Sequence, residues 1–87
     1  MAGSLQVSVV SAERELWSGE ATQVVAKTLI GEIGLLAGHE PVLGLLAPGE
    51  VRVTAVDGPV VRVRAEDGFL SMQGDIVTIV AGDAELV

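Results

Sequence analysis

The stretch VRVTAVDGPVVRVRAE, residues 51–66, alternates apolar and polar side chains on both sides of Asp57-Gly58-Pro59. Alternation with a period of two is typical of a strand that buries one face, and Asp-Gly between two such runs indicates a hairpin. A two-residue loop would pair Val53 with Arg62 and place a charge on the buried face, whereas a three-residue loop pairs Val53 with Val63. We therefore predict a hairpin with a three-residue loop.

The polar face of this hairpin carries three of the five basic residues of the chain. In the predicted register Arg52 lies opposite Arg64 and Glu50 lies opposite Glu66, with Arg62 on the same face. Each glutamate is diagonal to an arginine, within reach of a long side chain. We interpret this as a solvated face whose charges balance; the alternative is an electrostatic contact with an acidic neighbour.

Similar strand patterns continue away from the hairpin in both directions. Residues 5–9 and 23–28 alternate in the same way, and turn residues stand at Pro48-Gly49, Asp67-Gly68 and 73–75. Turn signals recur about every 8–12 residues, the spacing of a β-sandwich or barrel. The pattern predicts an all-β fold with Greek-key or jelly-roll closure.

The middle of the chain is glycine-rich. Gly31, Gly34 and Gly38 fall within eight residues. Because glycine supplies positive φ and close backbone approach, this segment is not a regular helix. We predict a short strand at 33–35 between two special turns, followed at 42–46 by a short apolar strand or a single helical turn.

Composition limits the kinds of partner and site. The 87 residues suit one small domain, and Val, Ile and Leu supply 29 of them, which favours strands. A net charge of −7 argues against nucleic acid as a partner and against an anionic membrane surface. No apolar run approaches the roughly 20 residues that span a bilayer, so we expect no direct membrane insertion. Cysteine is absent, which excludes disulfides and thiolate metal sites.

The residues contain no constellation typical of catalysis. His39 is the single histidine, too few for a zinc site without cysteine, and its predicted role is a hydrogen bond within its loop or a contact with a partner. No serine stands in a Gly-x-Ser-x-Gly elbow, and the glycine-rich segment lacks the Gly-Lys-Ser or Gly-Lys-Thr of a phosphate-binding loop. We expect no enzymatic activity, no cofactor and no metal.

Two other functions fit a small acidic β-domain less well. A carrier domain needs a modified lysine at a hairpin tip, but the only lysine, Lys27, lies within strand alternation. A sugar-binding sandwich or small enzyme is disfavoured because Trp17 and Phe69 are the only aromatic residues and no catalytic cluster is present. A small acidic β-sandwich that binds proteins or acts as a carrier remains the alternative.

The sequence GEIGLLAGHEPVL, residues 31–43, resembles the signature of the epsilon subunit of bacterial rotary (F-type) ATP synthase. That signature is Gly-Glu, an apolar residue, Gly, two further positions, Pro-Gly-His, any residue and Pro. The resemblance covers nearly the whole chain. Further stretches resemble other family elements in the same order: Val9-Val10-Ser11-Ala12-Glu13, Trp17-Ser18-Gly19, Pro48-Gly49, Val51-Arg52-Val53, Gly68-Phe69-Leu70 and residues 77–81.

The resemblance implies a flattened sandwich or jelly-roll-like domain of about ten short strands across residues 1–87. It implies a non-catalytic subunit of the central stalk, the rotor of a proton-translocating ATP synthase. Such a subunit binds the gamma subunit, sits on the c-ring of the membrane sector, and couples proton flow to ATP synthesis. Its expected place is peripheral, at the cytoplasmic face of the cell membrane.

The resemblance also implies roles for individual residues. Val10, Ser11 and His39 match positions near the gamma interface, and the segment from Gly31 to His39 matches the contact with the ring. Glu32 would there meet polar or basic groups of the ring loops. The partner-binding residues predicted in this way are Val10, Ser11, Gly31, Glu32, Gly34, Gly38 and His39.

The chain departs from the family pattern at several positions. Ala37 replaces the usual proline, Asp67 stands where a glycine often lies, and Gly82 replaces a common aspartate. Family members usually continue into a two-helix C-terminal domain, which we expect to be absent from this truncated or minimal subunit. Inhibition of ATP hydrolysis and ATP binding belong largely to those helices and are not assigned here. We expect residues 85–87 to fray.

Overall fold

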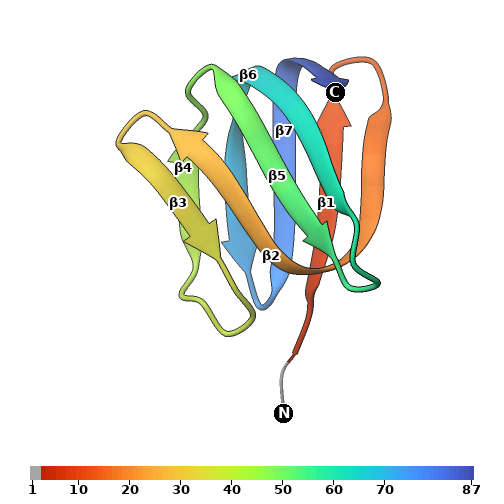
Figure 1. The fold of residues 1–87 in the computed structure, drawn as a ribbon. Helices are drawn as coiled ribbons and strands as arrows, with labels where there is room; N and C mark the ends of the chain where they lie inside the picture. The colour runs from red at the N-terminus through yellow and green to blue at the C-terminus, as the bar shows by residue number, and fades with distance from the viewer. Residues whose placement is uncertain (1–2) are drawn as a thin grey trace.

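The computed structural model describes residues 3–87, and within them the chain forms seven strands and no helix (Figure 1). The all-β prediction is therefore confirmed. The radius of gyration is 11.5 Å, close to the roughly 12 Å expected for a compact chain of this length. The strands are β1 (Leu5–Ser11), β2 (Glu15–Thr28), β3 (Gly31–Leu35), β4 (Val42–Leu45), β5 (Gly49–Ala55), β6 (Val60–Gln73) and β7 (Ile76–Leu86).

Three long strands serve both layers of the sandwich. The first half of β2 pairs with β1 and its second half pairs with β5 and β3. In the same way β6 pairs first with β5 and later with β4, while β7 accompanies both halves of β6. One layer therefore contains β3, β5, the second half of β2, the first half of β6 and the end of β7. The other layer contains β1, β4 and the remaining parts of the three long strands. The prediction of about ten short strands was wrong in number, because β2, β6 and β7 bend between layers without ending.

The hairpin of β5 and β6 has a different register from the predicted one. Val53 pairs with Val61 and Val51 with Val63, so the strands are shifted by two residues. Residues 56–59 form the connection, and the amide of Ala55 donates to the carbonyl of Pro59 at 2.9 Å. A shift of two preserves every side chain's face, since the period of a strand is two. The buried face was therefore predicted correctly although the loop length was not.

Asp67-Gly68 is a bend inside β6 and not the predicted turn. The ladder to β7 keeps its register across it, with Glu66 opposite Asp83 and Gly68 opposite Ala81. Asp67 has a φ of 59°, in the left-handed region. A Cβ added at Gly68 would overlap the Val80 carbonyl group and lie 2.5 Å from the Cα of Ala81. The glycine thus lets β7 cross close to β6 where β6 passes between the layers.

Replacing Asp67 by glycine is expected to raise the free energy of unfolding by about 0.5–1 kcal/mol, because a non-glycine residue at positive φ carries strain. The melting temperature should rise by about 2–8 °C for a domain of this size. Thermal unfolding followed by circular dichroism checks this. A lower melting temperature would show that the Asp67 side chain stabilises the bend more than its backbone strain costs.

The core lies between the two layers and is entirely aliphatic apart from Met72. The alternation predicted for residues 5–9 and 23–28 is confirmed, because the expected inward residues are the buried ones. Leu35 and Leu46 close the core from β3 and from the end of β4. The largest fully buried side chains are Leu5, Leu35, Leu70, Met72, Ile79, Val9, Val24, Val51, Val53, Val63 and Val77.

Two other local predictions are settled by the strand pairing. The segment at 42–46 forms strand β4 and not a helical turn. The expectation that residues 85–87 fray was wrong, since Leu86 pairs with Val63 and the Val87 amide donates to the Arg62 carbonyl at 3.0 Å. The end of β7 is held because it continues the ladder along the first half of β6.

Candidate docking surfaces

An apolar row crosses the outer face of the layer that contains β4, β6, β7 and β1. Leu45 pairs with Phe69, Phe69 with Val80, and Val80 with Val10, so these four side chains stand side by side on four strands. Leu45 is 61% exposed and Phe69 is 40% exposed; Leu43, one step along β4, is 78% exposed. We call Val10, Leu43, Leu45, Phe69 and Val80 the apolar face. A contiguous exposed apolar patch on a small domain indicates a surface that a partner covers.

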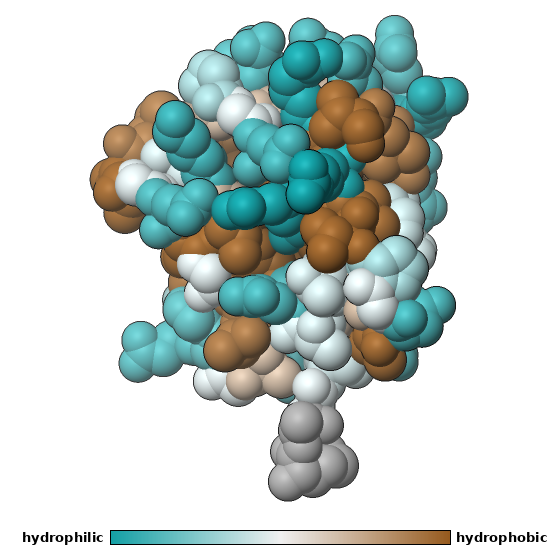
Figure 2. Space-filling model, in the orientation of Figure 1, coloured by the Kyte–Doolittle hydropathy of each residue, from teal (hydrophilic) through white to brown (hydrophobic). Residues whose placement is uncertain are grey.

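The opposite outer face is charged. Figure 2 shows this side, with hydrophilic residues across its centre. Arg52 and Arg62 lie directly opposite each other on β5 and β6. Arg52 forms an ion pair with Glu32 at 3.5 Å and Arg64 forms one with Glu85, and these are the two ion pairs within residues 3–87. The predicted partners of the arginines were other glutamates, but the interpretation as a solvated face with balanced charges holds for Arg52 and Arg64.

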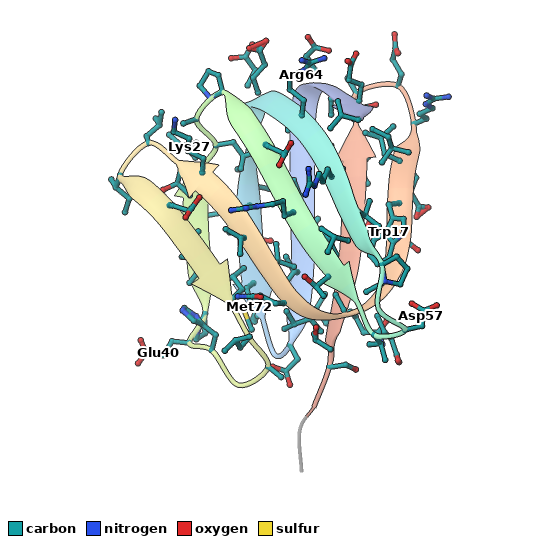
Figure 3. The ribbon with its side chains drawn as sticks, viewed as in Figure 1. Trp17, Lys27, Glu40, Asp57, Arg64 and Met72 are labelled. Carbon is teal, nitrogen blue, oxygen red and sulfur yellow. The ribbon has the colours of Figure 1, made fainter. Side chains whose placement is uncertain are left out.

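The structure places the predicted site residues of the glycine-rich segment along strand β3 and in the turns at its two ends. Gly31 begins β3, while Gly38 and His39 follow its end. Figure 3 shows this separation through their neighbours, with Lys27 near one end and Glu40 near the other. The segment is therefore a strand with a turn at each end.

The turn that precedes β3 carries two exposed apolar residues. Ile30 is 98% exposed and Leu29 is 64% exposed, and Gly31 follows them with a φ of 126°. We call Leu29 and Ile30 the β2–β3 tip. Glu32 is beside this tip on the charged face, where Lys27 is its cross-strand neighbour. A solvent-exposed turn ordinarily carries polar residues, so this tip is a second candidate for a partner contact.

Of the two predicted residues at the end of β1, only Val10 offers its side chain to a partner. The Ser11 hydroxyl is buried in the β1–β2 turn, where it donates to the Arg14 carbonyl at 3.1 Å and accepts from the amides of Glu13 and Arg14 at 3.2 Å each. Ser11 therefore shapes the turn next to the apolar face.

His39 lies in the β3–β4 loop, and Gly34 lies on the charged face. The His39 ring is exposed, and its Nδ1 donates to the Glu40 carbonyl at 2.7 Å, because a carbonyl can only accept. That hydrogen bond within the loop agrees with the role predicted for His39. Gly34 pairs with Val25 on the charged face, where a Cβ would contact only the Gln23 side chain at 4.0 Å. The fold itself does not require glycine at position 34.

The sequence reasoning missed Leu43, Leu45, Phe69, Val80 and the β2–β3 tip. One available signal was that β4, Val-Leu-Gly-Leu, carries apolar residues on both faces, as a strand covered on both sides does. Another was an isoleucine in a two-residue turn. Among residues 3–87 no three metal-ligating side chains come together. The same residues include no helix of the length and apolarity that crossing a membrane requires.

Comparison with known proteins identifies the family. The family described as ATP synthase, Delta/Epsilon chain, beta-sandwich domain matches residues 4–87. The ATP synthase epsilon chain of Streptomyces coelicolor is 45% identical over 86 residues, covering 99% of this chain and 69% of the relative. That of Micrococcus luteus is 49% identical over 82 residues, covering 94% of this chain and 90% of the relative.

A solved structure shares the fold. A chain in the cryo-EM structure of the Euglena gracilis mitochondrial ATP synthase, OSCP/F1/c-ring in rotational state 1, superposes with a TM-score of 0.88 at 25% identity. The match covers 95% of this chain and 53% of the Euglena chain. The resemblance seen in residues 31–43 is confirmed by these relatives, and with it the interpretation as a non-catalytic subunit. The chain belongs to the family of ATP synthase delta/epsilon chain β-sandwich domains.

Proposed function

We propose that the chain is a central-stalk subunit in the rotor of a proton-translocating ATP synthase, docking to the gamma subunit and to the c-ring and coupling proton flow to ATP synthesis. The observation that carries this proposal is the contrast between the two outer faces, one with a contiguous apolar row and one with charges. The Euglena chain of the same fold comes from a complex that contains F1 and the c-ring, which supports the same role.

The apolar face is the proposed contact with gamma. Val10, which the family pattern associates with gamma, stands at one end of the row that continues through Val80 and Phe69 to Leu45. Burying these side chains would supply about 25 cal/mol for each Å² of apolar surface removed from water. Because the strands beneath are fixed by the core, docking would order few groups and lose little entropy. Ser11 borders this contact, and His39, on the β3–β4 loop at the other end of β4, is proposed as a separate contact with gamma.

The β2–β3 tip is the proposed contact with the c-ring. Ile30 and Leu29 project at one end of the sandwich, where Gly31 allows the tight turn and Glu32 adds a charge beside it. An apolar tip can enter a gap between ring loops while the glutamate meets their polar groups. In this arrangement the subunit is peripheral, on the cytoplasmic face of the membrane, and it contacts the ring without entering the bilayer.

Single cysteines test both contacts, since the chain has none of its own. A photo-crosslinker on Leu45→Cys should join the chain to gamma, and one on Ile30→Cys should join it to subunit c, in the assembled complex. Arg62→Cys, on the charged face, serves as the matched control and should join neither. Mass spectrometry of the products identifies the partner. Crosslinks to gamma from Arg62→Cys and none from Leu45→Cys would show that the faces are assigned the wrong way round.

A further inference from the structure

Asp75 connects three segments of the chain at the end of the sandwich opposite the β2–β3 tip. Its carboxylate Oδ1 accepts a hydrogen bond from the Gly38 amide at 2.7 Å, across 37 residues of sequence. Its backbone carbonyl accepts from the Gln6 amide of β1 at 2.8 Å. Figure 1 shows the β6–β7 turn and the β3–β4 loop at the same end of the molecule. One residue therefore ties the loop to the turn and to β1.

The conformation of Asp75 shows that its side chain is not needed to make the turn. A turn is predicted at residues 73–75, and Gly74 and Asp75, with φ values of 58° and 63°, make it a type I′ hairpin turn. Glycine would occupy both positions without strain, whereas aspartate does so less readily. Aspartate is among the residues that accept this φ, and here its carboxylate also accepts the hydrogen bond from the Gly38 amide.

The β3–β4 loop has few other bonds to hold its shape. Within it the His39 amide donates to the Leu36 carbonyl at 3.1 Å, closing a turn in which Gly38 has a φ of 86°. That geometry is a type II turn with glycine at its third position. Ala37 occupies the position where proline would preset the backbone, so proline does not rigidify this loop. The Asp75 carboxylate restrains the loop from outside.

We infer that Asp75 is a positioning residue that presets the Gly38-His39 turn for docking to gamma, an inference that rests on the proposed function. A loop already held in its bound shape loses less entropy when a partner docks on it. The Asp75 carboxylate holds the Gly38 amide, and His39 is the next residue. Loss of the hydrogen bond leaves the sandwich intact but lets the turn move relative to the apolar face.

Two substitutions at Asp75 distinguish the effect of the hydrogen bond from the effect of the turn conformation. Asp75→Gly keeps the positive φ and removes the acceptor, while Asp75→Asn keeps both the acceptor and tolerance of this φ. Asp75→Gly should speed hydrogen exchange at the Gly38 amide by about tenfold or more. It should weaken gamma binding, measured by calorimetry with the full chain, by about five- to tenfold. Asp75→Asn should restore both values to near wild type, and neither variant should lower the melting temperature greatly.

The outcomes distinguish this inference from the function on which it rests. Asp75→Gly could speed exchange at the Gly38 amide and leave gamma binding unchanged, while a charge on the apolar face abolishes binding. In that case the inference about Asp75 is wrong, and the apolar face is still the contact with gamma. If Gly38 exchange is unchanged in Asp75→Gly, the hydrogen bond does not hold the loop and the inference also fails. If wild type does not bind gamma at all, it is the proposed function that fails.

Discussion

Replacing Gly68 by alanine is expected to lower the free energy of unfolding by about 3 kcal/mol or more. A Cβ at this position would meet the Val80 carbonyl group and lie 2.5 Å from the Cα of Ala81, and both are backbone of the neighbouring strand. Backbone cannot rotate away as the end of a flexible side chain can. Relief of the overlap therefore requires β7 to move from β6, which breaks ladder hydrogen bonds and opens the core beside Ile79 and Leu70.

The loss is large relative to the total stability. A domain of this size has about 4–13 kcal/mol to lose, so Gly68→Ala should lower the melting temperature by more than about 12 °C or leave the chain unfolded. Urea unfolding followed by circular dichroism gives the value. Gly34→Ala is the matched control, since a Cβ there has open space and the change should be neutral or stabilising by up to about 1 kcal/mol. Equal stability of the two variants would show that β7 yields to the added methyl group.

This chain shows which features of a β-fold can be predicted from the alternation of apolar and polar residues. The assignment of Val51, Val53 and Val63 to the buried face was correct. The buried face changes only when the register between the two strands shifts by an odd number of residues. The loop length was not predictable, since two registers of the hairpin that differ by two residues bury the same side chains. Asp67-Gly68 has the composition of a turn but forms a bend, because its positive φ and missing Cβ serve the crossing of β6 from one layer to the other.

The docking surfaces were only partly predictable for a related reason. Val10 and Glu32 came from the family pattern, which marks single positions along the chain. The row that joins Val10 to Leu45 depends on four strands from distant parts of the sequence pairing in one register. The apolar residues on both faces of β4 mark Leu45 as unusual, but Phe69 looks ordinary within β6. Their function as a surface emerges only when the topology sets them side by side.

Replacing Phe69 by aspartate is expected to weaken binding to gamma by at least about 100-fold. Phe69 is central in the apolar row, with Leu45 on one side and Val80 on the other. An aromatic side chain in the middle of an interface is a typical hot spot, and an aspartate there would be buried without a partner charge. Because Phe69 is 40% exposed in the free chain and faces outward, the folded sandwich should tolerate the change with a modest loss of stability.

Val60→Asp provides the matched control for this experiment. Val60 is 49% exposed, begins the same strand β6, and pairs with Thr54 within the other layer. The two variants therefore introduce the same charge at similar exposure on opposite sides. Calorimetry with purified gamma should give a wild-type affinity within about threefold for Val60→Asp, and no measurable binding for Phe69→Asp at micromolar concentrations. Equal losses of affinity in both variants would indicate a general effect of added negative charge, since each substitution changes the net charge of the chain from −7 to −8.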